Sequence, residues 1–371
     1  QDANGVGIEW VTLDTGALHE RLFRELTLPE TNIDVAFFLN TRAVESVTRL
    51  LEPLDEHMAE NPIENIDDIF PGLRDAMTFD GKLYGIPFRH ASSCFHYNER
   101  LLSEKGIEPP QSIEALIEAA RQLTETRDDG SKVYGFLING QGYANVVDLA
   151  RAWDGDFITL DYHVATSGEG MINAVGLLRD FYENGVMPSN WAAISDEEVN
   201  TWMQTGRAAM TITSCGRNRI YNDPEKSQEA GNIKTVALPV SEAFKDKFDV
   251  APAKVEFWTM VIPANAKHKD LSWALIRTMV SPENTLKAAL NGNGPVRAST
   301  YDTDEMKGQL PYALEEKAVL QVGRVPLPPF DNAAKASDIF VEELQAAVLG
   351  MKSTEDAMAS VEKRVAPLLP Q

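Results

Sequence analysis

Cysteine, long apolar runs and positive charge are all scarce in this sequence. Only Cys94 and Cys215 occur, far apart in the chain, so there is neither a disulfide framework nor a thiol-rich metal cluster. One bridge between them is possible, but the sequence alone does not favour it. No uninterrupted apolar stretch approaches about 18 residues, which excludes a membrane-spanning helix. No basic segment followed by an apolar one opens the chain, so we expect no signal peptide within it; the start at Gln1 leaves an exported origin open.

The shortage of positive charge limits the partners. Lys and Arg number 34 against 56 Asp and Glu, which gives a net charge of −22. Such a field repels nucleic-acid phosphates and anionic lipid headgroups, so neither nucleic acid nor a membrane surface is an expected partner. The 371 residues, 43% of them hydrophobic, suffice for two domains with separate cores.

The pattern of apolar residues predicts an α/β protein. Short β-branched or aromatic runs alternate with segments of helical period, which is typical of sheets covered by helices. We expect strands at 7–11, 33–38, 133–138, 208–213, 233–238 and 257–262, and helices at 18–26, 113–123, 333–349 and 354–365. Ser195 with Glu198, and Ser281 before Pro282, are typical helix starts. Pro87 ends the apolar run before it.

Catalytic and cofactor signatures are missing. Four GxG pairs lack the third glycine of a dinucleotide site, and neither GxSxG nor HExxH occurs. Asp128-Asp129-Gly130 predicts a hairpin turn rather than a calcium loop. On a strand, His90, Cys94 and His96 would share a face, but the local sequence supplies no further ligand, so we expect them to pack. We therefore predict no cofactor, no metal and no catalytic residues.

Aromatic residues beside amides and glycines are the informative feature that remains. They occur at 141–143, 257–258, 291–294 and 330–332. Sugars are bound by this combination, because apolar ring faces stack on Trp or Tyr while hydroxyls pair with amides, carboxylates and Arg. Core packing is the alternative for each aromatic residue taken alone.

Several short motifs, in their order along the chain, carry a family resemblance. They are Ile33-Asp34-Val35-Ala36-Phe37, Leu50-Leu51-Glu52-Pro53-Leu54, Gly81-Lys82-Leu83-Tyr84-Gly85-Ile86-Pro87, Tyr97-Asn98-Glu99-Arg100-Leu101-Leu102, Pro109-Pro110 and Gly206-Arg207-Ala208-Ala209-Met210-Thr211. Together they resemble the extracellular solute-binding proteins of the maltose-binding type, which serve ABC importers.

The resemblance implies two α/β lobes of the type II periplasmic-binding-protein fold, joined by a hinge. It puts residues 1–88 and 256–315 in the first lobe and residues 89–255 and 316–371 in the second. The family's usual first strand and helix have no counterpart before 7–11, so the first lobe would lack a strand. Hinge bending is expected near 87–93, 254–257 and 325–330.

Ligand contacts are carried over position by position. The expected residues lie after strands or at the lobe crossings: Asn40, Thr41, Arg89, His90, Gln141, Tyr143, Trp153, Arg217, Phe257, Trp258, Asn293, Arg297 and Asp331. Trp153 is either a ligand platform or core. The family's frequent Gly-Pro-Trp or Gly-Ser-Trp is replaced by 214–217, which favours a small ligand over a long oligosaccharide.

The resemblance therefore implies a monomeric, periplasmic or lipid-tethered receptor. It would close on a small carbohydrate or polyol and deliver it to the membrane permease subunits of an ABC importer, without catalysis. Three alternatives stay open. The ligand could be an acidic sugar held by Arg89, Arg217 and Arg297, or an amino acid or opine, or the protein could be an exported carbohydrate-active enzyme.

Overall fold

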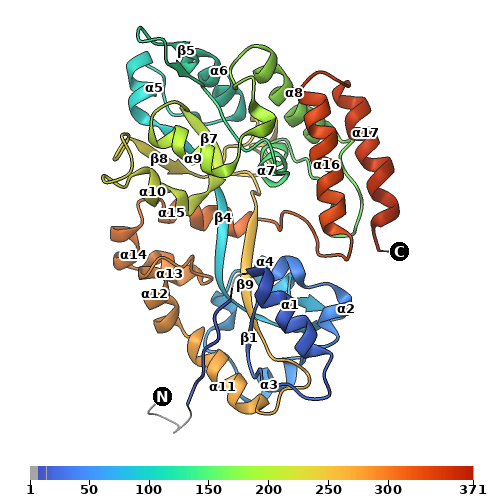
Figure 1. The fold of residues 1–371 in the computed structure, drawn as a ribbon. Helices are drawn as coiled ribbons and strands as arrows, with labels where there is room; N and C mark the ends of the chain where they lie inside the picture. Colours follow the sequence, from blue (N-terminus) through green and yellow to red (C-terminus); the bar gives the residue numbers. More distant parts are fainter. Residues whose placement is uncertain (1–6, 14, 371) are drawn as a thin grey trace.

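The computed structural model describes residues 7–13 and 15–370, which form two lobes connected by three segments (Figure 1). The first connection is the long strand β4 (Ile86–Asn98), which belongs to both lobes. The second precedes β9 (Val255–Val261), and the third follows α15 (Ala313–Val322). We call these crossings, at 90–93, 252–255 and 323–326, the first, second and third linkers.

The first lobe is built on the antiparallel strands β1 (Ala36–Leu39), β9 and the first half of β4, in the order β1-β9-β4. A small hairpin, β2 (Thr78–Phe79) with β3 (Lys82–Leu83), lies beside it. Its helices are α1 (Thr15–Leu26), α2 (Glu45–Thr48), α3 (Asp55–Glu60), α4 (Pro71–Asp75), α11 (Lys269–Met279), α12 (Pro282–Leu290), α13 (Ala298–Asp302), α14 (Asp304–Gln309) and α15.

In the second lobe the other half of β4 pairs with β7 (Met210–Ser214) and β8 (Ile233–Val236), both antiparallel. The hairpin of β5 (Glu125–Thr126) and β6 (Lys132–Val133) turns at the predicted 128–130. The helices are α5 (Glu99–Lys105), α6 (Ile113–Leu123), α7 (Ala144–Arg151), α8 (Glu169–Glu183), α9 (Asp196–Gln204), α10 (Asn218–Tyr221), α16 (Ala333–Val348) and α17 (Thr354–Val365). No helix in the described residues is long and apolar enough to cross a membrane.

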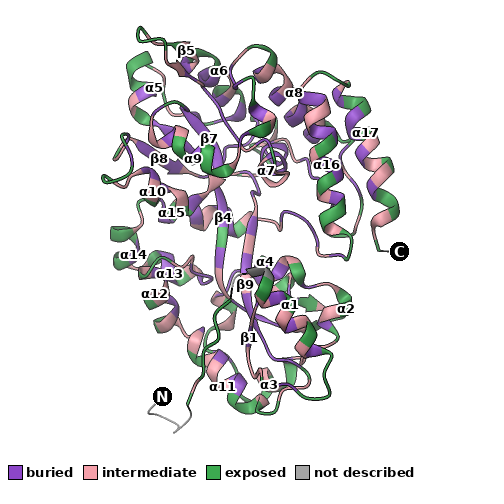
Figure 2. Cartoon of the chain, in the orientation of Figure 1, coloured by how far each residue is buried: buried purple, intermediate pink, exposed green. Residues whose placement is uncertain are grey.

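Each lobe has its own apolar core, and the cores define the lobe limits. The core changes within β4 between Ile86 and Phe95, and along the third linker between Leu320 and Leu327. The predicted limit at 315 is therefore wrong, because it falls inside α15, whose Val319 packs in the first-lobe core. In Figure 2 most of β4 is buried along its length. Ala91 is the one exposed residue of this strand.

Local signals for helix ends were reliable. Ser195 and Glu198 form the reciprocal capping box of α9, and the Ser281 hydroxyl accepts the backbone N–H of Asn284 at the start of α12. The last two helices, α16 and α17, lie where the period predicted them, with Gly350 in the left-handed region (φ 75°) after the first.

Two strand predictions and the predicted end of a run at Pro87 were wrong in ways that depend on long-range partners. Residues 7–13 form no strand, and Trp10 and Val11 are more than half exposed, since no neighbouring strand pairs with them. Of the predicted 133–138 strand, only Val133 belongs to a strand, as the last residue of β6. Conversely, Pro87 does not end a run: β4 continues through it with a register shift between Pro87 and Arg89, where a missing N–H is tolerated.

Candidate functional site

One face of β9 and of the residue before it is polar and only half buried. Lys254, Glu256 and Trp258 alternate with the buried Val255 and Phe257. Because successive side chains of a strand point to opposite faces, the first three lie on one face, which we call the β9 strip. Within it, Lys254 Nζ lies 3.5 Å from Glu256 Oε2. The strip begins where the second linker enters the first lobe.

Trp258 is held by neighbours on both sides. Arg89 is its partner on β4, and the Arg89 guanidinium carbon lies 5.3 Å from the centroid of the indole ring. The His19 ring of α1 lies 5.6 Å away on a tilted plane. Burial lowers the pKa of Arg89, which nevertheless stays a cation at neutral pH. An aromatic surface and a guanidinium therefore stand side by side at this edge of the first lobe.

Tyr143, the predicted contact of the second lobe, is the residue preceding α7. Its ring packs against Phe157 with centroids 6.1 Å apart. Burial raises the pKa of the Tyr143 hydroxyl, and the charge of Glu256 raises it further. The helix that follows carries Asp148, which accepts the backbone N–H of Lys254 at the start of the β9 strip. Through α7 the second lobe therefore contacts the β9 strip.

Asp148, one turn further along α7, is fully buried beside the second linker. Its Oδ1 accepts the backbone N–H of Lys254 at 2.5 Å, while Oδ2 has no hydrogen-bond partner among the described residues. Burial raises the pKa of Asp148, opposed by the positive charges of Lys254 and Arg151. Asp148 therefore attaches the linker backbone to α7.

A buried polar chain crosses from the first lobe to the first linker. Tyr301 donates to Glu316 Oε2 at 2.9 Å, and Ser92 donates to Glu316 Oε1 at 3.0 Å. Since the Tyr301 proton is committed to Glu316, His90 Nε2 donates to the Tyr301 oxygen at 2.8 Å. The backbone of Gly294 adds a further hydrogen bond, because its carbonyl accepts the His90 N–H. A larger residue does not fit at this position, since a Cβ on Gly294 would lie 2.5 Å from the His90 carbonyl oxygen.

The two cysteines do pair, contrary to what the sequence favoured. Cys94 and Cys215 form a disulfide that is fully buried, and Ser92 Oγ lies 3.1 Å from Cys215 Sγ. The reason is topological: β4 and β7 are neighbours, so position 94 on β4 and position 215 just past the end of β7 come together. His96 bonds Thr235 and the Ser214 carbonyl, and His90 bonds Tyr301, so both pack in the interior as expected of the 90–96 group. The ligand contact expected of His90 is therefore wrong, because its ring is buried and its Nε2 is engaged by Tyr301.

The buried Glu316 predicts a pH effect on stability. Burial raises the pKa of Glu316 from 4.5 to about 7. Between these values the folded state keeps a proton that the unfolded state has released, so stability falls as pH rises, by about 1.4 kcal/mol per pH unit. Glu316→Gln removes this loss. Denaturant titrations of both proteins from pH 4.5 to 8 should therefore diverge in favour of the variant as pH rises.

The comparison with Glu316→Gln is needed because His90 acts in the opposite direction. Burial lowers the pKa of His90 to about 3, so this group alone makes the protein less stable as pH falls below about 6.5. His90 is present in both proteins and cancels in the difference. Parallel stability curves for the parent and the variant would show that Glu316 is already ionised across the range.

Two expected ligand residues are structural. Phe257 is 1% exposed and lies in the first-lobe core, because it points to the opposite face of β9 from Trp258. Arg297 is fully buried in the first lobe, and its donors bond the carbonyls of Val280, Asn65 and Glu64. Both predictions are wrong, since neither side chain is free to meet a ligand.

Asn40 and Thr41 lie in a short 3-10 helix (Asn40–Arg42) that follows β1, and Asn293 and Asp331 lie on loops. Asn40 is buried, and its Oδ1 accepts the Phe257 N–H at 2.9 Å, so it supports the β9 backbone beside Trp258. Thr41 is half buried next to it. Asn293 donates to the Ala288 carbonyl at 3.3 Å. Asp331 of the second lobe accepts from Ser46 of the first at 3.3 Å and so joins the lobes.

The remaining candidates belong to the second lobe. Gln141 is exposed and donates to the Ala193 carbonyl at 2.7 Å, and Trp153 is half buried against the second-lobe core. Arg217 is half buried after β7, and its charge helps to keep the pKa of His96 low, mainly an effect of burial. Of the predicted residues, the structure places Arg89 against Trp258 and leaves Tyr143 half buried before α7.

Sequence reasoning missed Lys254, Glu256 and Asp148. The polar–apolar alternation from 254 to 258 was a usable signal for the first two, because it marks a strand with one accessible face. The sequence gave no signal for Asp148, since an acidic residue in a helical segment normally lies on the solvated face of the helix. Among residues 7–13 and 15–370, no group of three or more His, Cys, Asp or Glu side chains is arranged to hold a metal ion.

Comparison with known proteins identifies the family. Residues 1–311 match the model of the bacterial extracellular solute-binding proteins. The chain belongs to this family of binding proteins, and the predicted recognition and two-lobed fold are confirmed. In the solved structure of the sugar-binding protein MalE from Xanthomonas citri, the fold is the same: the TM-score is 0.82 at 22% identity, over 98% of this chain and 90% of that one.

Two relatives extend the comparison to ligands. A probable amino-acid ABC transporter periplasmic-binding protein of Sinorhizobium fredii is 21% identical over 98% of this chain and 83% of its own length. The mannitol-binding protein of Pseudomonas aeruginosa is 23% identical over 80% of this chain and 68% of its own. The relatives thus include receptors named for different ligands.

Proposed function

We propose that this protein captures a small, uncharged carbohydrate or polyol between its lobes and delivers it to the permease of an ABC importer, outside the cytoplasmic membrane. The observation that carries the proposal is the β9 strip with Arg89 on the first lobe and Tyr143 on the second. An aromatic face beside hydrogen-bonding groups suits the apolar and hydroxyl faces of a polyol or sugar. Relatedness to a mannitol-binding protein supports the same class.

The charges near the strip favour an uncharged ligand. Arg89 and Lys254 are offset by Glu256 and by the buried Asp148, and Arg297, expected as a third cation, is committed elsewhere. An anion would therefore gain little net attraction, whereas hydroxyls can both donate to the carboxylate and accept from the cations. The buried disulfide is consistent with an oxidising compartment such as the periplasm.

Binding and closure can be tested together. Saturating D-mannitol, at about 100 times its dissociation constant, should add about 2.7 kcal/mol to the free energy of unfolding in a thermal-shift assay. Small-angle scattering should show a smaller radius of gyration with the ligand, and the recovered ligand should be chemically unchanged. No shift with any of a panel of sugars and polyols would contradict the proposal, and hydrolysis of sugar conjugates would indicate an enzyme instead.

Trp258→Ala should weaken binding of the polyol or sugar identified by that screen by about 1 to 3 kcal/mol, because a desolvated aromatic contact is lost. Calorimetry on the folded Trp258→Ala protein measures this loss of binding free energy. Trp202→Ala is the matched control, since Trp202 of α9 also carries an arginine, Arg207, with its guanidinium carbon 4.1 Å from the ring centroid. Unchanged affinity in Trp258→Ala with intact stability would remove Trp258 from the site.

An amino acid or opine is the second candidate ligand. Glu256 could pair with the ammonium group of such a ligand, and Arg89 and Lys254 with its carboxylate. The Sinorhizobium fredii relative is named for amino acids. Salt dependence separates the candidates, because raising ionic strength from 0.02 to 0.5 M shortens the Debye length from roughly 20 Å to about 4 Å. Affinity that stays flat across this range supports an uncharged ligand, and a steep fall supports a charged one.

A further inference from the structure

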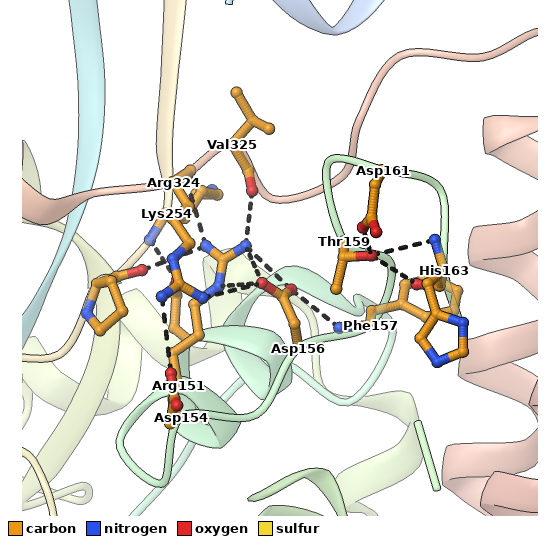
Figure 3. Close-up of polar contacts among 12 residues, drawn as sticks. Arg151, Asp154, Asp156, Phe157, Thr159, Asp161, His163, Lys254, Arg324 and Val325 are labelled. Carbon is orange, nitrogen blue, oxygen red and sulfur yellow. Dashed lines mark hydrogen bonds and ion pairs between the residues drawn. The ribbon is translucent and has the colours of Figure 1, made fainter. Parts of the chain in front are cut away.

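Arg151 at the end of α7 is one of the most completely bonded side chains of the second lobe. It is 1% exposed, and its guanidinium bonds both carboxylate oxygens of Asp156, with Nη2 lying 3.1 Å from Oδ1 and 3.2 Å from Oδ2 (Figure 3). The charge is therefore neutralised within its own lobe. Its remaining donor capacity is directed at the protein backbone.

The backbone groups that Arg151 holds belong to two different linkers. Nη1 donates to the carbonyls of Pro252 on the second linker at 3.4 Å and Arg324 on the third at 3.2 Å. Nη2 donates to the Val325 carbonyl at 2.7 Å. A planar fork with five donors can bond several acceptors at fixed angles, which the single ammonium of lysine cannot do.

The two linkers are also bonded to each other and to α7. Val255 N–H donates to the Arg324 carbonyl at 2.9 Å and Arg324 N–H to the Ala253 carbonyl at 3.2 Å, so they pair as parallel strands. Asp148, three residues before Arg151, accepts the Lys254 N–H. Asp148 and Arg151 of α7 thus attach the two paired linkers to the second lobe.

We propose that Arg151 is a positioning residue that makes the second and third linkers move as one body with the second lobe, so that bending occurs on the first-lobe side of Val255. This inference rests on the proposed function, in which the lobes close on a ligand. Tyr143 precedes the same helix, so a ligand contact there moves together with the anchored linkers. The bend then falls within the β9 strip, between the anchored Lys254 and the residues Glu256 and Trp258.

The space around the anchor is compatible with this role. A cavity of about 210 Å³ is lined by Arg151, Asp156, Arg324, Val325 and the 158–160 segment. Arg324 lies 3.6 Å from both Asp154 and Asp156, so the cations here are balanced by carboxylates and offer no anion site. The cavity lies directly beside the third linker, and the Arg151 bonds, together with the Asp148 bond to Lys254, hold the paired linkers against the second lobe.

The experiment measures the distance between the lobes without relying on a ligand. Spin labels at cysteines introduced for the exposed Arg49 and Lys363 report that distance by pulsed electron resonance, while the native cysteines stay in their buried disulfide. We expect Arg151→Lys to at least double the width of the distribution in ligand-free protein. If the competent fraction falls to about one tenth, apparent affinity for D-mannitol falls about tenfold.

Arg100→Lys is the matched control, because Arg100 forms a two-point ion pair with the buried Glu229 in the same lobe but touches no linker. It should lower stability while leaving the distance distribution as in the parent. A parent-like distribution in folded Arg151→Lys would overturn the inference. If that variant does not fold, Asp156→Asn decides by the same criterion, since it removes the charge that orients Arg151.

The outcome for the linkers is separate from the outcome for the ligand. If D-mannitol and every other sugar and polyol of the panel leave the parent distribution unchanged but Arg151→Lys still broadens it, the positioning role stands and the ligand class fails. If D-mannitol narrows or shifts the parent distribution and Arg151→Lys behaves as the parent does, the function stands and the positioning role fails.

Discussion

Arg297→Gln is expected to lower the free energy of unfolding by about 3 kcal/mol or more and to leave ligand affinity unchanged. The side chain is fully buried and bonds three carbonyls, those of Val280, Asn65 and Glu64, at 2.7 to 2.8 Å. A shorter, neutral amide reaches at most one of them. Each acceptor left unpaired in the interior costs about 1 to 3 kcal/mol.

Urea denaturation and calorimetry measure the two effects of Arg297→Gln separately. Arg277→Gln is the control, because within residues 7–13 and 15–370 Arg277 bonds a single carbonyl, that of Pro62, at 3.1 Å near the surface. Arg277→Gln should lower the free energy of unfolding much less than Arg297→Gln does. If the folded Arg297→Gln protein has the stability of the parent but binds the ligand more weakly, Arg297 is a ligand contact and not a structural residue.

Removal of the disulfide is the second large effect. The double variant Cys94→Ala/Cys215→Ala should lose about 2 to 5 kcal/mol of unfolding free energy, because the bond closes a loop of 121 residues in the unfolded chain. Denaturant titrations with and without reductant test this. Reductant should lower the midpoint for the parent and have no effect on the double variant.

The location of the disulfide makes a second observation possible. Cys215 lies beside Ser92, which bonds Glu316 on α15, so the bond sits where the first linker meets both lobes. If the bond also restrains the linker, the inter-lobe distance distribution of the double variant should broaden as well. A loss of stability without broadening would confine its role to the second lobe.

Features that depend on neighbours in the chain were predictable. The capping box of Ser195 and Glu198 and the start of α12 at Ser281 need only residues within one helical turn, so a sequence pattern specifies them. The same holds for the α/β alternation, and motif order over the chain was enough for the family and its two lobes.

Within the site, too, the sequence predicted only what depends on neighbouring residues in the chain. Trp258 and Tyr143 could be proposed from aromatic residues beside polar ones, but Phe257 could not be separated from Trp258 without knowing which face of β9 meets the core. Arg297 resembled a ligand contact for the same reason. The sequence around this arginine does not indicate that its partners, such as the Asn65 carbonyl, lie far away in the chain.

By itself, therefore, the sequence determined the class of fold, the helix ends and the kind of side chain available for a ligand. Only the tertiary structure decided which of those side chains remain free. It paired Cys94 with Cys215, buried Arg297 against carbonyls from elsewhere in its lobe, and brought Arg151 to two linkers distant in sequence. The physical reason is that burial and hydrogen-bond satisfaction are decided by contacts between segments far apart in the chain, which local patterns do not encode.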